Sequence, residues 1–158
     1  MSQQDEIKFI AEGELAGLVK LLRGLGLDCR YDGGASLSAV ILQSATDGRI
    51  LITRKPLAET LRTKVIRVLA TSPDEQLSEL ANQLPVAGYI RPFSRCLKCN
   101  TLLIAAPNAP TECIPPLILE RRLDLSQCPS CHRYYWEGSH VKRLRHRLQQ
   151  TGLLAPDH

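Results

Sequence analysis

Residues 7–32 have the sequence IKFIAEGELAGLVKLLRGLGLDCRYD, and this stretch decides the fold of the first half of the chain. The run IKFIA at 7–11 is typical of a short buried strand. Apolar residues then recur at helical spacing from Leu15 to Leu25, and Gly26 is placed to end that helix. The run DCRY at 28–31 is a second strand candidate. A strand, a helix and a strand in this order predict two parallel strands joined by a crossover helix.

The same alternation continues to residue 84. Ser36 is a candidate N-cap and Gly48 a candidate end for the next helix, while Ser72 begins a capping box with proline in the first turn. The runs RILIT and VIRVL have the β-branched composition of strands. We predict helices over 36–48, 56–61 and 72–84, and strands over 49–53 and 65–69. Since helices separate the strands, residues 1–84 are expected to form an α/β domain whose parallel sheet is covered on both faces.

Two Cys-x-x-Cys pairs, Cys96–Cys99 and Cys128–Cys131, dominate the second half. Each tight turn aims two thiolates at one metal, so the pairs together predict a closed, structural zinc site. Four cysteines complete that site without His132 or His140. A disulfide is a weaker alternative, because the opening MSQQDEIKF has no apolar signal core and indicates the cytoplasm. A redox pair at 128–131 lacks the strand-to-helix context that it needs.

The charge of the chain is concentrated in this half. Residues 91–158 hold 10 Lys and Arg against 5 Asp and Glu, whereas residues 1–90 hold 10 against 11. We expect a linker over 85–92 and, over 93–158, a zinc ribbon followed by a basic helix that Ser139 caps. The cationic excess suggests a polyanionic partner, with a merely solvated surface as the alternative. The side chains predicted to bind nucleic acid here are Arg133, Lys142, Arg143, Arg145 and Arg147, and Arg121-Arg122 extend the patch.

The sequence also contains an aromatic cluster and two cysteines outside the pairs. Tyr134, Tyr135 and Trp136 either stack on unpaired bases or form the small core of the ribbon. Cys29 and Cys113 are expected to be ordinary buried thiols. No apolar run approaches the roughly 18 residues that a membrane-spanning helix needs, so no membrane partner is expected.

Acidic side chains follow the first two predicted strands. Glu12 comes directly after the first strand and Asp32 after the second, and the third is followed by Arg54-Lys55. In an open parallel sheet, ligands bind at the carboxyl ends of the strands. The two carboxylates are therefore candidate ligands of a divalent metal ion, with Glu14 or Asp74 as a further candidate ligand. The alternative is that the glutamates are favoured at a helix start and that Asp32 is a turn residue.

Several segments together resemble one family. These segments are FIAEGELAGLVKLLRGLGLDCRYD, RILITRKPLAETL, FSRCLKCN, CPSCHRYYWEGSH and the closing basic helix. In order and spacing they are similar to the PIN-like ribonuclease domain with an appended zinc ribbon, named for the C-terminal region of the Mut-seven exonuclease. The resemblance covers nearly the whole chain. It implies a three-layer PIN-like α/β domain and acidic residues that hold magnesium or manganese for hydrolysis of RNA.

The sequence departs from that family at its acidic positions. The first family aspartate falls on Glu12, and the Tyr-Asp pair matches Tyr31-Asp32. The acidic cluster that follows falls on Gly34, Ser36 and Ser38, and the Asp of Thr-Arg-Asp falls on Lys55. An ammonium in place of a carboxylate disfavours a bound divalent cation. Lys55 and Arg54 are instead suited to hold a phosphate.

We therefore predict an RNA-binding or RNA-processing protein with a depleted acidic centre, in which the zinc ribbon and the basic helix grip the RNA. One alternative is an active metal-dependent endoribonuclease that uses Glu12 and Asp32 as catalytic ligands. The other is an adaptor whose basic surface docks an acidic protein.

Overall fold

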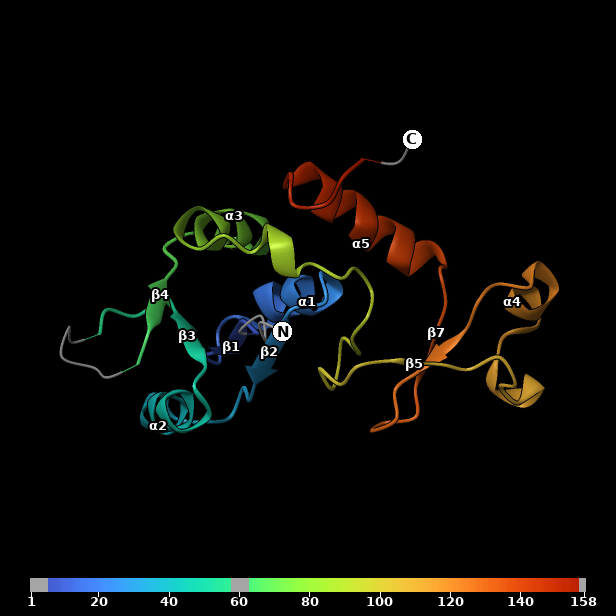
Figure 1. Cartoon of the computed structure of the whole chain (residues 1–158), viewed down its shortest axis with the longest axis horizontal. Coiled ribbons are helices and arrows are strands. Elements are labelled where there is room, and N and C mark those ends of the chain that lie inside the picture. The colour runs from blue at the N-terminus through green and yellow to red at the C-terminus, as the bar shows by residue number, and fades with distance from the viewer. Residues whose placement is uncertain (1–5, 58–62, 157–158) are drawn as a thin grey trace, which may run out of the picture.

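The first half of the chain forms a parallel sheet with helices on both faces. The structure is a computed structural model that describes residues 6–57 and 63–156. The sheet has the order β2-β1-β3-β4, and every pair is parallel. Its strands are β1 (Lys8–Ala11), β2 (Asp28–Tyr31), β3 (Ile50–Thr53) and β4 (Val65–Arg67). Its helices are α1 (Ala16–Gly24), α2 (Leu37–Asp47) and α3 (Pro73–Gln83). The predicted α/β class is confirmed (Figure 1), and the predicted helix at 56–61 falls largely on residues outside those described.

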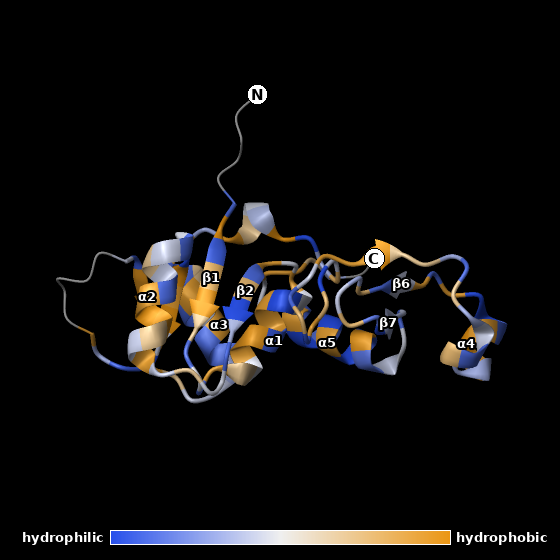
Figure 2. Ribbon diagram, turned by 90° about the horizontal axis from the view of Figure 1, so that it is seen from below, coloured by the Kyte–Doolittle hydropathy of each residue, from blue (hydrophilic) through white to orange (hydrophobic). Residues whose placement is uncertain are grey.

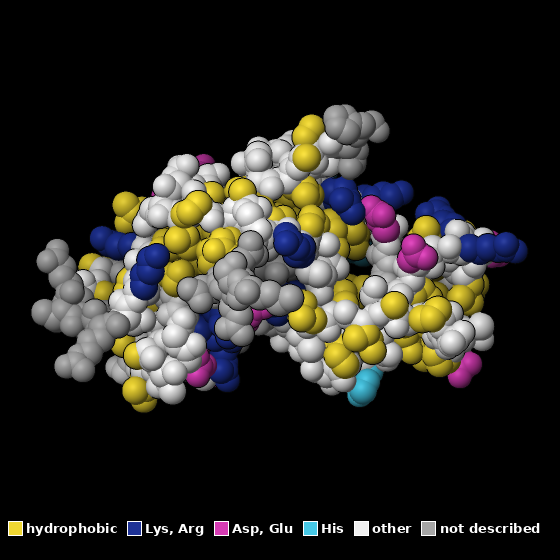
Figure 3. Space-filling view, in the orientation of Figure 1, with side chains coloured by type: hydrophobic (Ala, Val, Ile, Leu, Met, Phe, Trp, Pro, Cys, Tyr) yellow, Lys and Arg dark blue, Asp and Glu magenta, His cyan; other side chains and the backbone are white. Residues whose placement is uncertain are grey.

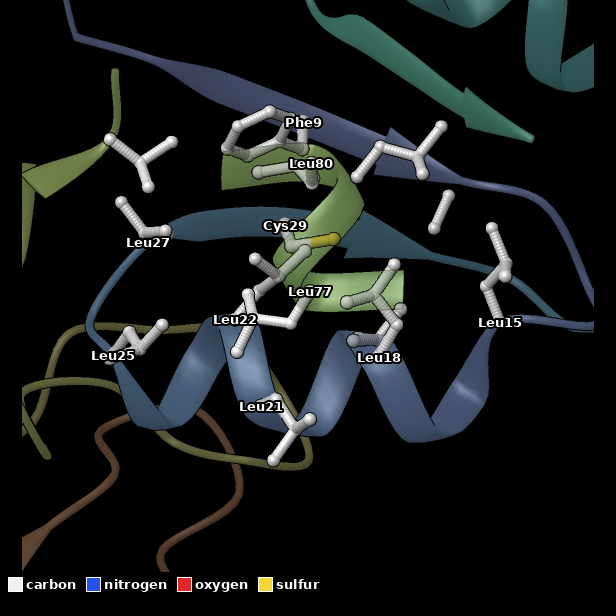
Figure 4. Close-up of a cluster of buried hydrophobic side chains, with 14 of the residues drawn as sticks. Phe9, Leu15, Leu18, Leu21, Leu22, Leu25, Leu27, Cys29, Leu77 and Leu80 are labelled. Atoms are coloured by element: carbon white, nitrogen blue, oxygen red, sulfur yellow. The ribbon is translucent and has the colours of Figure 1, made fainter. Parts of the chain in front are cut away.

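The strands alternate between two apolar layers. Phe9 and Ala11 point into the main core, with α1 and α3, whereas Ile10 packs with Val40 of α2 on the opposite face. Figure 4 shows Leu18 and Leu22 of α1 pointing towards the sheet, near Leu77 and Leu80 of α3, whereas Leu21 points to the other side of α1. This alternation is the period of two expected for strands that are buried on both faces.

The predicted helix boundaries of this half have the expected local causes. Ser36 and Ser72 each accept a hydrogen bond from the backbone N–H three residues ahead, at Ala39 and Glu75 respectively. Gly48 ends α2 with a φ of 66°. Gly26 follows the last turn of α1 with a φ of 82°, a conformation that suits glycine.

The second half contains a small antiparallel sheet and returns to the first half through its last helix. The sheet joins β5 (Ile104–Ala105), β6 (Ser126–Gln127) and β7 (Tyr134–Tyr135). A 3₁₀ turn (Thr111–Cys113) and α4 (Pro116–Arg121) lie between β5 and β6, and α4 lies at the end of the molecule away from the parallel sheet (Figures 1 and 2). The final helix α5 (Ser139–Gln150) inserts Leu144 and Leu148 into the main core beside α1.

Two details of this half differ from the expectation. Gly138, rather than Ser139, occupies the N-cap of α5, and no side chain caps that helix. Cys113 is exposed, although Cys29 is buried as expected. Cys113 lies in the 3₁₀ turn Thr111–Cys113, in which no residue is buried.

Residues 85–92, the predicted linker, run against the end of α1. They include a 3₁₀ turn (Ala87–Tyr89), and Val86 is buried in the main core. The Arg91 N–H donates to the Leu25 carbonyl at 2.9 Å. The division into 1–84, 85–92 and 93–158 stays a prediction, but the two halves share one core through α5. Among the described residues, no helix has both the length and the apolar character to cross a membrane.

Candidate metal centre and nucleic-acid groove

The four paired cysteines meet at one point. The sulfur atoms of Cys96, Cys99, Cys128 and Cys131 all lie within 4.8 Å of one another, and Cys96 Sγ is 3.8 Å from Cys131 Sγ. Thiolates at ~2.3 Å from a tetrahedral zinc ion would be separated by ~3.8 Å. The donor set and its spacing therefore fit a closed four-sulfur metal site, as the sequence predicts.

The two Cys-x-x-Cys turns, called knuckles below, have the same local structure. The N–H groups of Cys99 and Cys131 point at the Sγ of Cys96 and Cys128, at 3.3 and 3.4 Å. Each turn then ends on a residue with positive φ, at 68° for Asn100 and 64° for His132. His132 thus serves the backbone turn, as expected for a residue outside the ligand set.

The thiol group of one cysteine is readily deprotonated. Burial raises the pKa of Cys128, but hydrogen bonds from the backbone of Cys131 and Ser130 outweigh it and lower the pKa to about 7. The hydrogen bond with Cys131, together with burial and the neighbouring thiols, raises the pKa of Cys99 to about 12. The cluster therefore keeps protons that a metal ion would displace on binding.

The first knuckle is bonded to the edge of the parallel sheet. Arg23 of α1 is buried and donates to the carbonyls of Cys29, Leu97 and Lys98, each at 3.0 Å. Asn100 accepts from the Cys29 N–H at 3.0 Å, so its amide satisfies the open side of β2. These bonds connect the metal centre to the α/β half through backbone groups.

Asp28 completes this connection. Its Oδ1 accepts hydrogen bonds from Arg49 and Asn100, both at 2.7 Å. Burial alone would raise the pKa of Asp28, but the hydrogen bonds from Arg49 and Asn100 and the charge of Arg49 lower it below its usual value. The carboxylate is therefore stabilised in its charged form.

At the carboxyl ends of the strands, the structure places a lysine against a buried glutamate. The Glu12 side chain is 4% exposed, and its Oε2 accepts from Thr53 Oγ1 at 3.1 Å and lies 3.7 Å from Lys55 Nζ. Glu12 Oε1 is buried and has no hydrogen-bond partner. An ammonium thus lies beside this carboxylate, where its charge disfavours a second bound cation.

The other predicted acidic residues do not join Glu12 in a cluster. Asp32 is exposed and accepts from the Gly34 N–H at 3.0 Å, which is a turn contact. Glu14 lies 3.9 Å from Arg54, and Asp74 lies 3.2 Å from Arg147. Within the described ranges, the cysteines are the single group of three or more potential metal ligands. The residues present at the strand ends therefore do not fit a magnesium or manganese site.

A large groove runs between α1, α4, β7 and α5. Its volume is about 1140 Å³, and its lining contains no Asp or Glu. The cations in the lining are Lys20, Arg23, Lys98, Arg121, Arg133, Arg143 and Arg147. Tyr31, Tyr134, Tyr135 and Trp136 line the same groove. In Figure 3, Lys and Arg side chains gather over α5 and towards α4.

The groove contains some of the predicted nucleic-acid-binding residues and omits others. Arg133, Arg143 and Arg147 line it. Arg145 instead pairs with Glu137 at 3.0 Å, stacks over the Phe93 ring and lines a smaller cavity of about 210 Å³. Lys142 is exposed outside the lining, and Arg54 and Lys55 lie at the strand ends beside carboxylates.

Sequence reasoning missed Lys20, Arg23 and Lys98. The leucine pattern of α1 indicates a core helix, and Lys98 appeared only as a spacer between two metal ligands. Lys20 and Arg23 are three residues apart on one helix, so their shared face was the available signal.

The comparisons with known proteins agree with this architecture. The family model described as Mut7-C RNAse domain matches residues 7–148, which include the parallel sheet, both knuckles and most of α5. No curated protein and no solved structure matches the chain.

Proposed function

This chain belongs to the Mut7-C RNAse domain family, and we propose that it acts as an RNA-binding module whose metal-binding acidic centre is depleted. Membership gives the chain a ribonuclease-like or RNA-processing role at the coarse level. The binding mode and the loss of catalysis are the proposal. The single observation that carries it is the groove, which combines seven Lys and Arg side chains with four aromatic ones and no acid.

The charges of the groove suit the backbone of RNA. Lys20, Lys98 and Arg143 are exposed and line the groove from α1, the first knuckle and α5. Cations that are spread over three elements can contact successive phosphates of one strand, and release of counterions then provides affinity. The lining itself contains no carboxylate, and among the described residues the one ion pair of a groove cation joins Arg147 to Asp74 at 3.2 Å.

Zinc would contribute structure to this site. Bound by Cys96, Cys99, Cys128 and Cys131, it would crosslink the two knuckles. Residues next to these ligands line the groove, namely Lys98 in the first knuckle and Arg133 after the second. The knuckles therefore set the position of groove cations relative to α1, where Arg23 bonds the first knuckle.

The strand-end geometry argues against hydrolysis in this chain. Catalysis of this type requires carboxylates that hold metal ions between the attacking and leaving oxygens. Here Lys55 Nζ lies 3.7 Å from Glu12, and Asp32 is used in a turn. No step of a cleavage reaction follows from these residues.

A metal-dependent endoribonuclease is the second candidate, and one observation favours it. Glu12 Oε1 is buried without a hydrogen-bond partner, which is costly unless something binds it. An RNA cleavage assay with Mg²⁺ and then Mn²⁺ tests this candidate. Cleavage by the wild type that Glu12→Ala abolishes would establish it, whereas cleavage by Lys55→Asp alone would show that one charge separates the two functions.

Binding is tested by anisotropy of a labelled RNA that contains both paired and unpaired segments. We expect the double variant Lys98→Glu/Arg143→Glu to bind at least ~10-fold more weakly than the wild type. Lys64→Glu is the matched control, because Lys64 is exposed and lies outside the groove. Equal affinity of the groove variant, the control and the wild type would refute the proposal. Binding of an acidic protein in place of RNA would support an adaptor instead.

A further inference from the structure

The three adjacent aromatic residues of the ribbon, Tyr134, Tyr135 and Trp136, have different contacts. All three line the groove, but the hydroxyl of Tyr135 is bonded to the first Cys-x-x-Cys turn. The Tyr135 hydroxyl lies 3.0 Å from Cys96 Sγ and accepts from the Leu97 N–H at 3.2 Å. Tyr135 therefore holds the ribbon together.

Tyr134 and Trp136 remain available to a ligand. Both are half-buried and both line the groove. The position of Trp136 is fixed by the turn that follows it, because the Gly138 N–H donates to the Trp136 carbonyl at 2.9 Å. A Cβ at position 138 would lie 2.9 Å from the indole Nε1, so the glycine lets the ring lie against the turn. The indole therefore packs against the backbone of Gly138.

The wall contributed by the α4 segment is apolar except for Arg121. Pro115, Leu117 and Ile118 line the groove, and Leu117 is 57% exposed. A double helix presents phosphates, sugars and base edges, and its base faces are hidden in the stack. Aromatic and apolar walls inside a cationic groove would therefore be unused by a duplex. They fit unpaired bases, whose faces stack on aromatic rings while the backbone follows the cations.

We infer that the groove binds a single unpaired RNA strand, with bases stacked on Tyr134 and Trp136. This inference rests on the proposed RNA-binding function and specifies its substrate class. The groove volume of about 1140 Å³ is slightly above the range of small-ligand pockets (~300–1,000 Å³), so the groove has room for a short segment of an RNA strand. The cations supply affinity for any RNA, and the two rings supply the preference for unpaired bases.

The chain has a built-in reporter for this inference. Trp136 is its single tryptophan, so fluorescence excited at a wavelength that tyrosine does not absorb reports this ring alone. We titrate the full chain with an unstructured RNA oligonucleotide and, in parallel, with a fully paired RNA duplex of the same length at the same salt. The expected result is quenching by the unpaired strand and an affinity at least ~10-fold higher for it than for the duplex.

Variants separate stacking from charge. Trp136→Leu and Tyr134→Leu should each weaken binding of the unpaired strand by about 5- to 150-fold, the factor that corresponds to loss of one stacked base. Trp136→Phe and Tyr134→Phe, which keep an aromatic face, should retain most of the affinity. Both leucine variants should leave duplex binding unchanged, and circular dichroism and metal content confirm that they fold.

The outcomes are distinguishable. Equal affinity for unpaired strand and duplex, with no change in Trp136 fluorescence, would overturn the inference and leave charge-driven RNA binding standing. Loss of duplex binding in the leucine variants would also overturn it, because the rings would then support the groove rather than read bases. Absence of binding to either RNA would overturn the proposed function as well.

Discussion

Replacing Lys55 by methionine should destabilise the fold, because it removes the cation that faces a buried carboxylate. The Glu12 side chain is 4% exposed, and Lys55 Nζ lies 3.7 Å from its Oε2. Apart from Thr53, no hydrogen-bond donor among the described residues reaches this carboxylate, since its Oε1 has no partner there. Methionine keeps the length of the side chain, so the substitution tests the charge rather than the packing.

The distance between Lys55 Nζ and Glu12 Oε2 gives the size of the expected loss in stability. At an effective dielectric constant of ~20, two unit charges 3.7 Å apart attract each other by about 4.5 kcal/mol. Lys55 is 52% exposed, and solvent screening reduces this value, because fully exposed pairs contribute only about 0.2–1 kcal/mol. We therefore expect Lys55→Met to lower the free energy of unfolding by about 1–3 kcal/mol at neutral pH.

Urea denaturation at neutral pH measures this loss. Lys64→Met is the matched control, because Lys64 is an exposed lysine of the same half without a carboxylate partner among the described ion pairs, and it should change stability little. The double variant Glu12→Gln/Lys55→Met should recover most of the loss, since it removes both charges. Unchanged stability in Lys55→Met would refute the claim that this lysine compensates the buried glutamate.

The same pair predicts a response to magnesium. The wild type should gain no stability from millimolar Mg²⁺, because Lys55 already faces Glu12. Lys55→Asp would place two carboxylates together, and it should gain about 1.4 kcal/mol at a free Mg²⁺ concentration ten times its Kd. A wild-type gain as large as that of the variant would contradict the view that the lysine excludes the metal.

Three further predictions concern the join between the two halves. Gly26→Ala should lower the free energy of unfolding by about 2–4 kcal/mol in urea, because the φ of 82° and the close Arg91 carbonyl both oppose a Cβ. The purified chain should contain one zinc ion. Removing it with a chelator should lower the melting temperature of the parallel-sheet half as well as that of the ribbon, because Arg23 and Asn100 join the two. An unchanged melting temperature after removal of the metal would contradict this prediction. The lowered pKa of Asp28 gives stability that is present above the unfolded value of 3.8 and lost as pH falls through the folded pKa, so Asp28→Asn should flatten that acid dependence in urea unfolding measured between about pH 5 and pH 2.5.

The local pattern of the sequence was sufficient for the parallel-sheet half. Ser36, Gly48 and Ser72 mark helix ends through contacts with residues only a few positions away, so their roles are visible in the sequence. Gly26 was predicted for its conformation alone. Its second reason, the neighbouring Arg91 carbonyl, arises from packing across a long stretch of chain. Ser139 was predicted wrongly as a cap because Gly138 has the extended backbone of the N-cap position.

For the site as well, the features that depend on local sequence were predictable and those that depend on distant segments were not. The metal ligands were predictable because each knuckle is a local turn with its own spacing. The groove was only partly predictable, because Lys20, Lys98 and Arg143 come from distant segments that meet when α5 packs on α1. Arg145 and Arg147 belong to the same helix, yet one pairs with Glu137 outside the groove and the other lines it. The sequence showed that the second half is basic, but which basic side chains line the groove depends on tertiary packing.

Binding and cleavage are separable in this architecture because different elements supply them. The groove cations come from α1, the ribbon and α5, whereas metal-binding acids would have to stand at the ends of β1, β2 and β3. The positions at which the resemblance expects further acids are Gly34, Ser36, Ser38 and Lys55, and none of them lines the groove. Substitutions at these four positions would remove a metal site without moving any of the side chains proposed to contact RNA. The groove nevertheless reaches Tyr31, whose hydroxyl donates to the Gly13 carbonyl next to Glu12. An RNA strand bound in the groove would therefore extend towards Glu12, as expected if the RNA-binding surface was kept while the metal-binding acids were lost.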